Sequence, residues 1–85
     1  MTGKYAPLFD WLKARGQAVQ LVSVPFAELE RLLGGALPRS ARTHRAWWAN
    51  AVSGGHVWAA AWLQAGWRVA HVEREGGWVR FERAA

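Results

Sequence analysis

The stretch WRVAHVEREGGWVRFE, residues 67–82, decides the fold of this chain. Its two halves, WRVAHVE and WVRFE, alternate apolar and polar side chains with the period of two that a half-buried strand requires. Gly76 and Gly77 lie between the halves and supply the backbone freedom of a turn, so the stretch predicts a β-hairpin. Strict alternation predicts Trp67, Val69 and His71 on one face and Arg68, Ala70 and Val72 on the other.

The residues before the hairpin predict three helices and one more strand. Residues 56–65 are rich in alanine and favour a helix that Gly66 ends, and residues 18–24, AVQLVSV, favour a strand. Pro25 opens a helix that ends at residues 34–35, and Pro7 suits the first turn of another that Gly16 can end. The apolar stripes expected to face the core are Tyr5, Leu8, Phe9 and Leu12 in the first helix, Phe26, Leu29, Leu32 and Leu33 in the second, and Val57, Trp58, Ala61, Trp62 and Ala65 in the third.

This element order predicts one small α+β domain spanning residues 1–85. The order is helix, strand, helix, helix and hairpin, which is winged-helix-like because a small sheet would pack against three helices. One feature departs from that pattern. Residues 36–55 form an enlarged basic connection between the second and third helices, where a helix-turn-helix has a short turn.

The connection itself, ALPRSARTHRAWWANAVSGG, leaves two interpretations open. In one, Ser40 caps a short helix over residues 41–50, which places Ala41, His44, Arg45 and Trp48 on one face. In the other, the segment is an irregular loop.

Charge is concentrated in the middle of the chain. The formal net charge is +5, from 11 Lys and Arg against six Asp and Glu. Residues 1–30 and 73–85 are each neutral, whereas residues 31–72 hold five arginines and no acidic residue. An unbalanced arginine-rich block indicates an anionic partner. The alternative is a solvated surface with no partner.

Arginines recur at every third position of the connection, at Arg39, Arg42 and Arg45. A guanidinium group can pair bidentately with a phosphate or with the edge of guanine. Ser40 and Asn50 are side chains that commonly hydrogen-bond to phosphates or bases. A structural alternative is that the arginines pair with glutamates of the second helix.

Two adjacent tryptophans follow the arginines. Neighbouring residues of a helix or strand do not share a face, so only one of Trp47 and Trp48 is expected to be buried. We expect Trp48 in the core and Trp47 packed on a sugar or base, where an indole can stack. The predicted nucleic-acid-binding residues are thus Arg39, Ser40, Arg42, Arg45, Trp47 and Asn50.

Several classes of protein are disfavoured by composition. The chain has no cysteine, which excludes disulfides and thiolate chemistry. The three histidines match no metal-binding spacing, and the basic block lacks the carboxylates that two-metal or triad catalysis needs. No apolar run would span a membrane, and the first residues lack a signal-peptide layout. We expect a cytoplasmic, non-enzymatic protein with no cofactor and no metal.

Three phrases resemble a small bacterial and phage domain of unknown function. They are KYAPLFDWL, FAELERLLGGALPRSARTHRAWWAN and AWLQAGWRVAHVE, which together cover nearly the whole chain. The resemblance places a signature, L-P-x-S-A-R-x-x-R-x-W-W-x-N, on residues 37–50, with Arg39 at a variable position. It implies a domain that occurs alone or beside nucleic-acid enzymes, which favours DNA as the partner.

We therefore expect a DNA-binding module that contacts double-stranded DNA through residues 39–50. Arg74 at the hairpin turn, with Arg80 and Arg83 beyond it, would act as a wing on the backbone. One alternative is a protein-interaction module, such as a phage or mobile-element factor that docks on a host enzyme through the same segment. A pocket for a nucleotide or modified base is a third possibility. A monomer and a homodimer are both compatible with the sequence.

Overall fold

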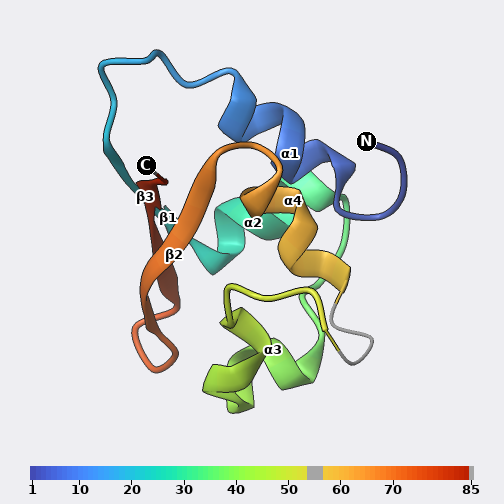
Figure 1. The fold of residues 1–85 in the computed structure, drawn as a ribbon. Helices are drawn as coiled ribbons and strands as arrows, with labels where there is room; N and C mark the ends of the chain where they lie inside the picture. The colour runs from blue at the N-terminus through green and yellow to red at the C-terminus, as the bar shows by residue number, and fades with distance from the viewer. Residues whose placement is uncertain (54–56, 85) are drawn as a thin grey trace.

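The computed structural model describes residues 1–53 and 57–84, which form a three-stranded antiparallel sheet with the helices packed on one side of it (Figure 1). The helices are α1 (Ala6–Lys13), α2 (Phe26–Leu33), α3 (Arg39–Thr43) and α4 (Ala60–Leu63), with 3-10 turns η1 (Arg45–Trp48) and η2 (Val57–Ala59). The strands are β1 (Leu21–Pro25), β2 (Trp67–Glu73) and β3 (Trp78–Arg83). The predicted α+β class is confirmed. In the part of the chain so described, no helix has the length and apolar character to cross a bilayer.

Strand β3 lies in the middle of the sheet, which has the order β1-β3-β2. Phe81 pairs with Val22 on β1 and with Val69 on β2, and Val79 pairs in the same way with Val24 and Val72. These apolar pairs form the face that the helices cover, because one face of a half-buried sheet packs on the core. The polar face, which carries Ser23, Arg68 and Arg80, stays exposed.

The predicted hairpin is confirmed, but the predicted division of its faces is wrong beyond Val69. The register of β2 against β3 shifts between Val69 and His71, so Ala70 is an extra residue in the strand. Such a β-bulge reverses the inward and outward alternation that follows it. Val72 is therefore buried, and His71 is exposed beside Trp78, with 5.4 Å between the two ring centroids.

The first two helices form where the sequence predicts them. Leu8 and Leu12 bury the inner face of α1, and Phe26 and Leu29 that of α2. Gly34 ends α2 with a φ of 75°, a left-handed conformation that glycine adopts without strain.

The third helix is shorter than predicted. In place of one helix over residues 56–65, η2 leads into the single turn of α4. Ala61, Trp62 and Ala65 are buried as expected, but Val57 is 67% exposed and Trp58 only half-buried. The predicted helix start at His56 lies outside the described residues.

Tryptophans build much of the core, and the indole N–H groups of Trp48, Trp62 and Trp67 donate to acceptors within the fold. Trp48 stacks on Phe26, with ring centroids 5.4 Å apart and an interplanar angle of 6°, and donates its Nε1–H to the Ala41 carbonyl at 2.8 Å. Trp67 donates to the Leu12 carbonyl at 3.1 Å. A buried indole N–H needs a partner. The rings therefore fill the core, and these bonds hold them in fixed orientations.

Candidate functional site

The basic connection folds as two short turns joined by one extended residue. Helix α3 begins at Arg39, directly after Pro38, and no side chain caps it, so the predicted cap at Ser40 is wrong. His44 has φ −127° and ψ 113°, which ends α3 before η1 begins. The segment is thus neither one helix over residues 41–50 nor an irregular loop.

Trp47 and Trp48 are both buried, at 6% and 1% exposure, so the expectation that only one would be buried is wrong. Successive residues of a 3-10 turn differ in direction by about 120°. Trp48 faces Phe26, whereas Trp47 lies against Trp58, with ring centroids 5.0 Å apart and an interplanar angle of 12°. Both indoles are enclosed because the fold surrounds η1 on more than one side.

Asn50 serves the fold rather than an open surface. Its Nδ2 donates to the Val69 carbonyl at 3.0 Å, and its Oδ1 accepts from the Val69 N–H at 2.8 Å and from Trp62 Nε1 at 3.0 Å. Two of these bonds tie the connection to β2 next to the bulge, and the third ties it to α4. We therefore reassign Asn50 from a predicted DNA contact to a structural link.

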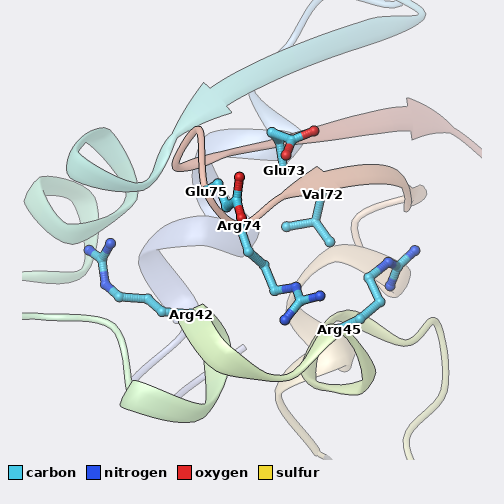
Figure 2. Close-up of a pocket in the computed structure, with 6 residues that line it drawn as sticks. All are labelled: Arg42, Arg45, Val72, Glu73, Arg74 and Glu75. Atoms are coloured by element: carbon cyan, nitrogen blue, oxygen red, sulfur yellow. The ribbon is translucent and has the colours of Figure 1, made fainter.

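Three arginines line one hollow where the connection meets the hairpin turn. Arg42, Arg45 and Arg74 line an open hollow of about 330 Å³ together with Val72, Glu73 and Glu75, which we call the arginine hollow. Figure 2 shows Arg74 reaching from the hairpin toward α3 and η1, with its guanidinium group between those of Arg42 and Arg45. Arg74 Nη1 donates to the Thr43 carbonyl at 2.8 Å, which holds this side chain across the gap.

Arg42 is not a free cation. Its Nη2 lies 2.9 Å from Glu30 Oε2, and its guanidinium carbon lies 5.3 Å from the centroid of the Phe26 ring. Glu30 Oε2 also accepts the Leu37 backbone N–H at 2.8 Å. The structural alternative, an arginine paired with a glutamate of the second helix, therefore holds for Arg42, whereas Glu28 of the same helix pairs with Arg31.

The other predicted contacts are exposed and differ in position. Arg45 and Arg39 have exposed side chains that make no hydrogen bond or ion pair to the described residues. Arg45 lines the arginine hollow, whereas Arg39 does not. Ser40 is exposed as well and lines a separate, apolar hollow on another side of α3.

The hairpin side of this site, residues 72–75, lies outside the set predicted from the sequence. Arg74 was expected only as a wing, because its approach to α3 depends on how the hairpin packs. Glu75, at the same turn, adds a negative charge to the hollow. The charged residues at the turn, REGG, were the only signal in the sequence, and they do not specify which segment the turn faces.

Glu30 gives the first testable prediction. The Leu37 N–H, followed by Arg42, holds the pKa of this carboxyl below its ordinary value of 4.5. A carboxylate whose pKa is depressed by folding stabilises the fold above its unfolded pKa, and this stabilisation is lost as the pH falls through the folded pKa. We therefore expect the wild-type chain to be more stable than Glu30→Gln at neutral pH and this difference to shrink below pH 4.5.

Urea denaturation at a series of pH values measures that difference. Glu28→Gln, on the same helix and also ion-paired at the surface, is the matched control. A difference between wild type and Glu30→Gln that stays constant from neutral to strongly acidic pH would contradict the prediction.

Fold and site together define a small α+β domain with an arginine-lined hollow on its surface. The family model for "Domain of unknown function (DUF7662)" matches residues 5–85, so the chain belongs to this family. This agrees with the resemblance to a domain of unknown function. Searches among curated proteins and among solved structures gave no match.

Proposed function

We propose that this domain is a non-catalytic DNA-binding module that holds the backbone of double-stranded DNA in the arginine hollow. One observation carries the proposal: Arg74 of the hairpin turn lies between Arg42 and Arg45 of the connection, over the same hollow. Guanidinium groups from two distant segments thus face one space. Arginine suits this role because its planar fork matches the oxygens of a phosphate.

The balance of charge in the hollow favours an anion, although modestly. Three arginines and two glutamates line it, which gives 3 − 2 = +1. Figure 2 shows the Glu73 carboxylate pointing away from the guanidinium groups, and Glu73 Oε2 lies 3.4 Å from His71 Nε2. Arg45, which has no partner among the described residues, and Arg74 are the cations best placed for a phosphate. Arg42 would first have to leave Glu30.

A winged-helix-like mode of docking is part of this proposal. The element order and the sheet order β1-β3-β2 support it, and the β2–β3 turn that carries Arg74 would be the wing. Helix α4, which takes the place of the third predicted helix, would not read the DNA, because it is a single turn whose Ala61 and Trp62 are buried. The contacts would come from α3, η1 and the wing.

The alternative of a protein-docking surface centred on the two tryptophans has less support. Hot-spot residues of a protein interface bury a large area against the partner. Trp47 and Trp48 are only 6% and 1% exposed, so neither indole offers such an area. DNA binding through a few phosphates predicts steep salt dependence, whereas a docking surface of apolar contacts does not.

Fluorescence anisotropy of a labelled duplex tests the proposal. We expect saturable binding that weakens several-fold or more between about 50 and 200 mM salt, because released counterions drive association. As a control, Arg68→Ala removes one positive charge outside the arginine hollow, at the far end of β2, where Arg68 pairs with Glu82. We expect this variant to bind like wild type. No binding at the lower salt would refute the proposed function.

A further inference from the structure

A second hollow is lined by other residues of the same short segment. Its walls are Ser40, His44, Ala46, Trp47 and Trp58, and its volume is about 310 Å³. We call it the indole hollow. Ligand pockets begin at roughly 300 Å³, so this space suits a single small ring system rather than a peptide segment.

The walls of the indole hollow combine aromatic and polar groups. Trp47 and Trp58 stack on one another, and Trp58 Nε1 donates to the Trp47 carbonyl at 2.7 Å, so this wall is fixed. His44 Nδ1 lies 2.8 Å from Thr43 Oγ1, which leaves Nε2 as its second polar atom. Ser40 adds a hydroxyl. Aromatic walls with a few polar groups are the chemistry that receives a nucleobase, by stacking and by hydrogen bonds to its edge.

Two exposed arginines are neighbours in sequence of residues that line the indole hollow. Arg45 lies in the chain between His44 and Ala46, which both line the hollow, and Arg39 directly precedes Ser40. Both arginines are exposed and have no ion-pair partner among the described residues. A nucleotide brings phosphates that these arginines attract, whereas an uncharged ring brings no such group.

We propose that the indole hollow receives one unpaired base of the bound DNA, while Arg45 and Arg39 contact the phosphates on either side of that nucleotide. The inference rests on the proposed function and adds a preference to it: the domain favours DNA that offers an unpaired base. Unpairing an intact duplex has a cost, so a site of this kind selects DNA in which a base is already free.

Three labelled duplexes of one sequence test this preference at one fixed salt concentration. The first is fully paired, the second carries one extra unpaired thymidine, and the third carries an abasic nucleotide at that position. The abasic duplex has the same local flexibility without a base. We expect the duplex with the unpaired thymidine to bind about tenfold more tightly than the other two, because base–aromatic stacking is the added contact.

Ala46→Leu tests the location, because Ala46 is exposed and lines the indole hollow, so a larger side chain fills the space without removing a core contact. We expect it to abolish the preference for the unpaired thymidine, so that the three duplexes bind about equally. Ala49→Leu is the matched control, since Ala49 is exposed and does not line the hollow. It should retain the preference.

Each other outcome has a distinct meaning. Equal binding of the thymidine and abasic duplexes, with the paired duplex still bound, would overturn the base site and leave the proposed function intact. A preference that survives Ala46→Leu would also overturn it. No binding of any duplex at low salt would refute the proposed function and this inference with it.

Discussion

Replacing Asn50 with alanine should lower the free energy of unfolding by about 3 kcal/mol, because three hydrogen bonds lose their partner at once. The Val69 N–H and the Trp62 indole N–H would be left without an acceptor inside the fold. An 85-residue domain has a stability of roughly 4–13 kcal/mol, so the loss is a large fraction of the total.

Urea denaturation followed by tryptophan fluorescence measures this loss. Gln64→Ala is the control, because Gln64 is an exposed amide whose side chain makes no hydrogen bond to the described residues. We expect the control to stay within about 0.5 kcal/mol of wild type. If Asn50→Ala did the same, the assignment of Asn50 as the link between the connection and β2 would be wrong.

Removing Arg45 and Arg74 together should weaken binding of duplex DNA about a hundredfold. A charge-assisted hydrogen bond contributes roughly 1.5 kcal/mol at the lower end of its range, and two of them correspond to about two factors of ten. Both side chains are exposed, and the Arg74 bond to the Thr43 carbonyl is a surface contact, so the fold should persist. Anisotropy titration of Arg45→Ala/Arg74→Ala against wild type gives the ratio.

The matched control for that variant is Arg31→Ala/Arg68→Ala. It also removes two positive charges, but from exposed arginines that pair with glutamates and do not line the arginine hollow. We expect its affinity to stay within about threefold of wild type, since distant charges act weakly through screened fields. Equal weakening by the two double variants would mean that net charge, rather than this hollow, binds the DNA.

Local patterns predicted the first two helices, the hairpin and the end of α2, because these depend on nearby residues. The Gly34 end of α2 and the turn at Gly76 and Gly77 are of this kind. The bulge at Ala70 has no local signal. It directly follows Val69, whose N–H and C=O both bond to Asn50, 19 positions before Val69. A pattern of alternating residues cannot include such a contact.

The candidate site was predictable in part. The arginine spacing located the basic connection correctly, but exposure and pairing depend on residues far along the chain. Trp47 is buried because Trp58 covers it, and Arg42 is paired because Glu30 of α2 faces it. Arg74 joins the hollow only because the hairpin turn folds over α3. Charge and aromatic content thus led to the proposal of a nucleic-acid ligand, whereas the geometry decided which side chains are exposed.

The most direct test of DNA binding at the arginine hollow is the salt dependence of affinity in wild type and in Arg45→Ala/Arg74→Ala. Each phosphate contact contributes about 0.9 to the slope of log affinity against log salt concentration. The slope of the double variant should be shallower by about two if Arg45 and Arg74 each neutralise one phosphate. Identical slopes in the two proteins would contradict the account, because neither arginine would then contact the DNA backbone.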